Sequence, residues 1–177
     1  ASNPVLAQAI VTDSKGLVAG EVSVPVADGK MPAYRAMPAG PGKFPVILVV
    51  QEIFGVHEHI KDMCRRYAKQ GYYAIAPEMF ARQGDVSKMT DIQTILSQVV
   101  SKVPDAQVCA DLDATLAFAR ASGKADAQRT GLVGYCWGGR TAWVYARHNS
   151  KLNAAVAYYG LLDGLKAPEL RPEDPID

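Results

Sequence analysis

The sequence has 177 residues, 49% of them hydrophobic, which is long enough for one buried core and short for two. Nineteen lysines and arginines against 18 aspartates and glutamates leave a formal net charge of +1, which excludes the strongly charged surface of a typical nucleic-acid-binding protein. The cysteines are few and scattered, and no apolar run reaches the length of a membrane span. We therefore expect one cytoplasmic domain over residues 1–177 that binds a small molecule, with neither nucleic acid nor membrane as a partner.

Strand and helix patterns alternate along the chain. Alternating apolar residues from Val22 to Ala36 predict a hairpin with its turn at Asp28-Gly29. Continuous apolar runs predict four buried strands, at residues 46–50, 72–76, 130–133 and 154–158. Helical patterns fall between them, at residues 58–69, 90–103, 105–121 and 138–147. This order predicts a three-layer α/β fold with a mostly parallel sheet, which binds its ligand beyond the carboxyl ends of the strands.

The most specific motif is Gly134-x-Cys136-x-Gly138, which lies between a predicted strand and a predicted helix. It has the spacing of a nucleophile elbow, with cysteine in place of serine. A cysteine at the first turn of a helix lies near free N–H groups that favour a thiolate. We interpret Cys136 as a catalytic nucleophile, whereas Cys64 and Cys109 fall within helical patterns and are expected to be structural.

Three segments give the sequence a resemblance to the dienelactone hydrolase family, a branch of the α/β-hydrolases with a cysteine nucleophile. The segments are Gln51-Glu-Ile-Phe-Gly55, Phe80-Ala-Arg-Gln83 and Gly134-Tyr-Cys-Trp-Gly-Gly139, and they occur in the order found in the family. The resemblance runs from about Val22 to Gly160. It implies an α/β-hydrolase fold and the hydrolysis of small lactones or esters without a cofactor or metal.

The resemblance also implies roles for four further residues. Glu52 is the family's carboxylate beside the nucleophile, which opposes the thiolate at rest and helps to form it when substrate binds. The backbone N–H groups of Ile53 and Trp137 form the oxyanion hole of this fold. Arg82 is a clamp for a substrate carboxylate, because a guanidinium pairs with a carboxylate through two parallel hydrogen bonds.

The sequence departs from the family after the elbow, where the catalytic acid and histidine should follow. His148 is the only histidine beyond Cys136, and it lies at the far end of the helix that Cys136 begins. Asp163 comes too early for the family's acid. We therefore expect the domain to be incomplete at its C-terminus, without its last two strands and with its base supplied from outside these residues.

Other interpretations remain open from the sequence alone. His57 or His59 could face Cys136 and act as the base, although His-Glu-His at a helix start is more typical of a solvated cap. The same two histidines with Glu52 provide too few ligands for a metal site. A second functional hypothesis is a non-catalytic small-molecule-binding relative, or an inactive fragment, that lacks the triad acid and histidine.

Overall fold

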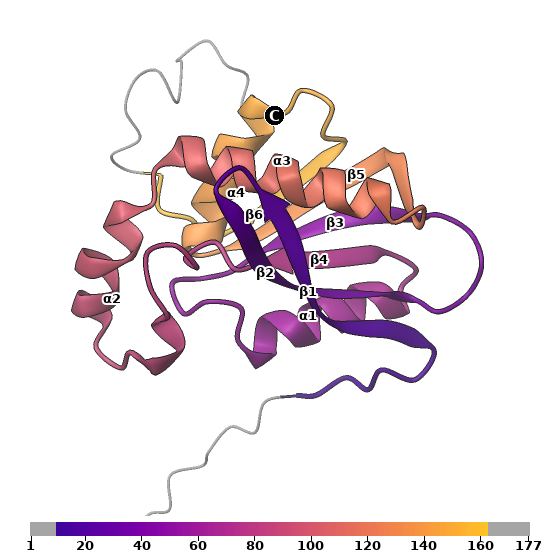
Figure 1. The fold of residues 1–177 in the computed structure, drawn as a ribbon, viewed down its shortest axis with the longest axis horizontal. Coiled ribbons are helices and arrows are strands. Elements are labelled where there is room, and N and C mark those ends of the chain that lie inside the picture. The colour runs from indigo at the N-terminus through magenta and orange to yellow at the C-terminus, as the bar shows by residue number, and fades with distance from the viewer. Residues whose placement is uncertain (1–9, 163–177) are drawn as a thin grey trace, which may run out of the picture.

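The computed structural model describes residues 10–162 and forms one six-stranded sheet in the order β1-β2-β4-β3-β5-β6 (Figure 1). The strands are β1 (Leu17–Val26), β2 (Gly29–Pro38), β3 (Phe44–Val50), β4 (Tyr73–Pro77), β5 (Ala125–Tyr135) and β6 (Ala154–Tyr158). The hairpin β1-β2 joins β4 in antiparallel pairing, whereas β4, β3, β5 and β6 run parallel. The predicted mostly parallel sheet is therefore confirmed.

Helices cover both faces of the sheet, as the alternating pattern predicts. They are α1 (Glu58–Lys69), α2 (Ile92–Gln98), α3 (Asp105–Ala121) and α4 (Trp137–His148), with short 3-10 turns η1 (Val86–Lys88) and η2 (Val100–Lys102). In Figure 1, α1 lies below the sheet, and α3 and α4 lie above it. This arrangement gives the three layers of an α/β-hydrolase fold. No helix within residues 10–162 is both long enough and apolar enough to cross a membrane.

The central strand β3 explains how the layers are held together. Val46, Leu48 and Val50 belong to the core beneath α3 and α4, whereas Val49 belongs to the core against α1. Successive side chains of a strand point to opposite faces, so a strand buried on both faces must be apolar throughout. Each such buried side chain contributes about 1.5–3 kcal/mol to folding. Packing on both faces therefore holds β3 in position, and Glu52 follows its carboxyl end.

The predicted helix over residues 90–103 is wrong as one element. The chain forms α2, which begins after the Asp91 cap, and then the separate turn η2. At Val99 the backbone leaves helical geometry, with φ −119° and ψ −67°. Two β-branched residues at 99–100 and a proline at 104 disfavour a continuous helix here. The hairpin turn is also one residue earlier than predicted, because Val26 pairs with Gly29.

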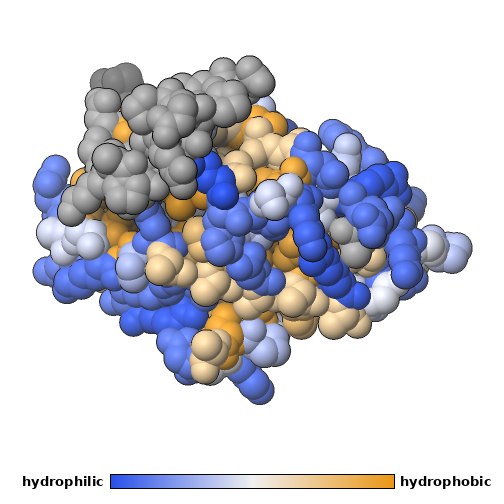
Figure 2. All heavy atoms as spheres, turned by 90° about the horizontal axis from the view of Figure 1, so that it is seen from above, coloured by the Kyte–Doolittle hydropathy of each residue, from blue (hydrophilic) through white to orange (hydrophobic). Residues whose placement is uncertain are grey.

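The edge of the sheet formed by β6 exposes apolar side chains. Along β6, Val156 and Tyr158 are 45% and 47% exposed and line a groove of about 500 Å³ with Tyr67 of α1. From above, by contrast, hydrophilic side chains form most of the rim and apolar ones gather in the middle (Figure 2). Within residues 10–162, the β6 edge is thus open and apolar on the side of α1.

Candidate active site

The carboxyl ends of β3 and β5 bring Glu52 and Cys136 to the same edge of the sheet. The two strands are parallel neighbours, and Val50 pairs with Gly134. Glu52 lies two residues after Val50, and Cys136 lies two residues after Gly134. Both residues therefore lie at the same level beyond the ends of adjacent strands. Neighbouring strands are about 4.8 Å apart. The fold therefore brings together the two residues that the sequence predicted as nucleophile and carboxylate.

Cys136 occupies a strained turn between β5 and α4. Its φ of 55° and ψ of −116° lie where side chains other than glycine are rarely found. The Cys136 N–H donates to the Tyr158 carbonyl at 2.9 Å, and its own carbonyl accepts from the Gly139 N–H at 2.8 Å. The surrounding backbone thus holds a partly exposed thiol at the first turn of a helix, as a nucleophile elbow requires.

The glycines of the motif are required by close backbone contacts. A Cβ on Gly134 would lie 1.8 Å from the Gly138 carbonyl oxygen, and one on Gly138 would lie 2.4 Å from that of Val50. On Gly139, a Cβ would meet the Tyr158 carbonyl oxygen at 2.4 Å. Real Cβ atoms do not approach backbone this closely. The motif therefore lets α4 start directly against the ends of β3 and β6.

Glu52 is held by a histidine that the sequence did not assign to it. His57 Nε2 lies 2.9 Å from Glu52 Oε2, and the Glu52 side chain is only 14% exposed. Burial raises the pKa of the Glu52 carboxyl, but the hydrogen bond from His57, with a backbone hydrogen bond and the charges of His57 and His59, lowers it overall. Glu52 is therefore stabilised as a carboxylate. No hydrogen bond within residues 10–162 joins His57 or His59 to Cys136.

The predicted oxyanion donors lie on the two segments that flank this edge. Ile53 follows Glu52, and Trp137 is the first residue of α4. Within residues 10–162, neither backbone N–H donates to another backbone group. The two side chains pack against the core, and the Trp137 ring meets Phe80 edge-on at 4.8 Å. Within residues 10–162, both amides thus lack a backbone partner, and their side chains belong to the core beside this edge.

Tyr159 is a further residue at this edge that the sequence did not single out. It follows Tyr158, whose partner in β5 directly precedes Cys136. Its φ is 41°, and Cys136 and Tyr159 are the two residues other than glycine with positive φ among those described. Slight burial and the negative charge of Glu52 raise the pKa of Tyr159. Its phenol therefore stays protonated beside both groups. From the sequence alone, Tyr159 is only a residue that follows the strand predicted at 154–158.

Arg82 is already bonded to acidic groups of its own chain. Its two terminal nitrogens each lie 2.7 Å from an Asp111 oxygen, and its Nε lies 2.8 Å from Asp28. The hydrogen bonds with Asp111 raise the pKa of the guanidinium. The Asp111 side chain is 3% exposed, whereas that of Asp28 is 60% exposed. The substrate clamp remains a prediction, and Asp28 is the partner that a substrate carboxylate could replace.

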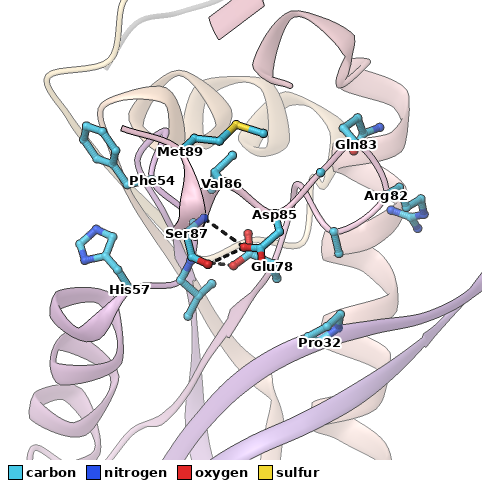
Figure 3. Close-up of a pocket in the computed structure, with 14 residues that line it drawn as sticks. Pro32, Phe54, His57, Glu78, Arg82, Gln83, Asp85, Val86, Ser87 and Met89 are labelled. Atoms are coloured by element: carbon cyan, nitrogen blue, oxygen red, sulfur yellow. Dashed lines mark hydrogen bonds between the residues drawn. The ribbon is translucent and has the colours of Figure 1, made fainter. Parts of the chain in front are cut away.

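A pocket of about 660 Å³ lies beside these groups, between the loop after β3 and the loop after β4 (Figure 3). His57 and Arg82 both line it, but Cys136 does not. Figure 3 shows the His57 ring at one wall, Glu78 near the middle, and the Arg82 guanidinium turned away from both. The pocket therefore reaches the predicted site through His57, the residue that holds Glu52.

The remaining titratable candidates lie apart from this edge or outside the described residues. His148 ends α4, as predicted, and pairs with Asp113 at 2.7 Å. Asp163 lies outside the described residues. Burial raises the pKa of the Cys64 thiol, and it raises that of Cys109 to about 11. Both thiols are therefore poor nucleophiles, which agrees with the structural role predicted for them.

Comparison with known proteins shows which family the sequence belongs to. The sequence profile of the dienelactone hydrolase family matches residues 31–176. The chain belongs to the dienelactone hydrolase family. This confirms the predicted resemblance and identifies the protein as a member of a hydrolase family with an α/β-hydrolase fold.

Individual relatives agree with the family. A protein of Methylorubrum extorquens, whose name proposes carboxymethylenebutenolidase activity, is 63% identical over the whole chain, which covers 61% of that relative. A proposed dienelactone hydrolase from Klebsiella pneumoniae is 54% identical in its crystal structure, with a TM-score of 0.81 over 86% of this chain and 64% of that one. A Bradyrhizobium protein, named as a 2-oxo-3-(5-oxofuran-2-ylidene)propanoate lactonase by inference, is 30% identical over 82% of this chain and 57% of its own length. The chain thus spans under two thirds of these relatives.

Proposed function

We propose that the protein hydrolyses small esters or lactones through a covalent acyl-enzyme on Cys136. The observation that carries this proposal is the strained elbow, which holds a partly exposed thiol at the start of α4 with Glu52 at the same level of the adjacent strand. An elbow of this kind serves nucleophilic attack on a carbonyl group. The dienelactone hydrolase relatives support the same reaction class.

In the proposed mechanism, the Glu52 carboxylate accepts the proton of the Cys136 thiol once substrate is bound. The thiolate then attacks the carbonyl carbon, and the N–H groups of Ile53 and Trp137 stabilise the resulting oxyanion. The alkoxide leaves with a proton to give a thioester, which water hydrolyses to the acid and the free thiol. Two such donors can lower the barrier by several kcal/mol. As the family resemblance implies, the proposed base for this water is a histidine outside the 177 residues of this sequence.

The proposed substrate is a small ester or lactone that carries a carboxylate. The expected role of Arg82 supports this class, and so does the name of the Bradyrhizobium relative, which describes an anionic lactone. Arg82 lines the pocket that reaches the site through His57, and its guanidinium would select a charged substrate by turning from Asp28 towards a substrate carboxylate in that pocket. The alternative function, non-catalytic binding, would retain this pocket but not turnover.

Replacement of the nucleophile tests the proposed reaction. Cys136→Ala in the protein at its native length should lower turnover of a carboxylate-bearing lactone by about a thousandfold or more. Cys109→Ala is the matched control, because that thiol is buried in α3 and should be dispensable. Steady-state kinetics with both variants decide the matter. Full turnover in Cys136→Ala would refute the proposal.

A further inference from the structure

His57 is the one side chain in the described site that contacts both Glu52 and the large pocket. Its Nε2 lies 2.9 Å from Glu52 Oε2, and its ring lines the 660 Å³ pocket, where it forms one wall (Figure 3). The side chain is 35% exposed, so a ligand in the pocket can reach it. His57 therefore connects the space for substrate with the carboxylate beside the nucleophile.

Hydrogen bonds and close packing hold the loop that carries His57. The His57 N–H donates to the Gly55 carbonyl at 2.9 Å, and the His57 carbonyl accepts from the Lys61 N–H at 3.1 Å. Gly55 has a φ of +78°, and a Cβ there would lie 3.0 Å from Glu78 and from Val86. The loop is thus closely packed against the segment after β4, and His57 enters α1 at a fixed point.

Two aromatic neighbours restrict the imidazole itself. The rings of His57 and His59 stack, with centroids 6.2 Å apart and planes 18° apart, and Phe54 meets His57 edge-on at 6.4 Å. The imidazole thus has one ring nitrogen on Glu52 and an aromatic ring on two sides. A hydrogen bond held in this way orients a carboxylate as well as stabilising it.

We infer that His57 is the positioning residue of Glu52: it keeps the carboxylate ionised and oriented towards the thiol, so that Glu52 can take the thiol proton when substrate enters the pocket. The inference rests on the proposed function and extends it to a residue that does not touch the reacting atoms. The transferred proton moves from Cys136 Sγ to a Glu52 oxygen, and the imidazole donates its hydrogen bond throughout.

The inference predicts a change in the pH profile. The groups that face Glu52 are His57 and His59 from the loop and α1, Cys136 from the elbow, and Tyr159 from the end of β6. In the folded protein the pKa of Glu52 is lowered, so activity that needs the carboxylate persists as pH falls until that pKa is reached. Loss of the His57 hydrogen bond should raise this pKa and move the acidic limb to higher pH.

His57→Leu removes the donor, and His57→Gln keeps a neutral N–H at a similar place. In the protein at its native length, His57→Leu should shift the acidic limb of kcat/KM upward by about one pH unit and lower the plateau about tenfold, as expected for one hydrogen bond to a charged group. His57→Gln should restore most of the original position of the acidic limb and most of the plateau value. His148→Leu, the matched control, removes a histidine that pairs with Asp113 at the end of α4, away from Glu52, and should change activity less than twofold.

A carboxyl titration of Glu52 by ¹³C NMR provides a readout that does not depend on turnover. Its midpoint should rise in His57→Leu and return in His57→Gln. An unchanged midpoint or an unchanged acidic limb in His57→Leu would overturn the inference. Cys136→Ala, measured in parallel, separates the two ideas: if this variant turns over normally, the proposed function fails, whereas an inactive Cys136→Ala with an unchanged His57→Leu profile overturns only the role of His57.

Discussion

Arg82 is the residue at which the expected role and the observed contacts differ most. Its guanidinium is bidentate to buried Asp111 and also bonded to exposed Asp28. An exposed ion pair is worth about 0–1 kcal/mol, so a substrate carboxylate could displace Asp28 at low cost. The pair with Asp111 is more important for the fold, because removal of one partner leaves a buried charge unpaired.

Arg82→Ala therefore has two expected effects that one experiment can separate. Loss of the clamp should raise KM for a carboxylate-bearing lactone by about tenfold, which corresponds to about 1.4 kcal/mol. The KM for a neutral ester of similar shape should change little. Because both substrates are measured with the same variant, any loss of stability from the unpaired Asp111 affects them equally. An equal rise in KM for the two substrates would contradict the clamp.

The sequence indicated most of the site residues but not how they contact one another. Cys136 could be predicted because a strand, a glycine-rich turn and a helix follow in order, whereas Ile53 and Trp137 followed only from the resemblance to the family. The hydrogen bond between His57 and Glu52 could not be predicted, because it depends on the path of the four residues between them. A histidine just before a helix, soon after a strand-end carboxylate, is the signal that could have suggested it.

At the scale of elements, α1 and α3 begin and end where the sequence predicted. Their apolar spacing and flanking residues specify them locally. The split of the predicted helix at 90–103 depended instead on the weak helix preference of its last residues, which periodicity does not register. The strand β5 is longer than predicted, because Ala125 and Asp126 pair with Phe44 and Pro45 ahead of the apolar run that the sequence shows at 130–133.

The contact between α4 and β3 gives a prediction at this scale. Gly138→Ala places a methyl group 2.4 Å from the Val50 carbonyl oxygen, so it must push α4 away from the sheet. We expect the free energy of unfolding to fall by about 3 kcal/mol. Gly131→Ala is the control in β5, because its Cβ would lie 3.5 Å from the nearest atom and should cost less than about 1 kcal/mol. The free energies of unfolding are measured by urea denaturation. Equal values for the two variants would contradict this account of the motif.

At the scale of the whole molecule, the class of the fold followed from sequence but the strand order did not. Alternating strands and helices indicate a parallel sheet with helices on both faces. The placement of β3 between β4 and β5, and of the hairpin beside β4, is decided by long-range packing that no local pattern encodes. The same order places the ends of β3, β5 and β6 side by side, and the site depends on this arrangement.

The covalent intermediate tests the central claim most directly. The protein at its native length should be mixed with a slowly hydrolysed ester, quenched in acid within the first turnover, and measured intact and after digestion by mass spectrometry. The account predicts an added mass equal to the acyl group, located on the peptide that contains Cys136, and no such adduct in Cys136→Ala. Turnover without an adduct on Cys136, or with the acyl group on another residue, would contradict it.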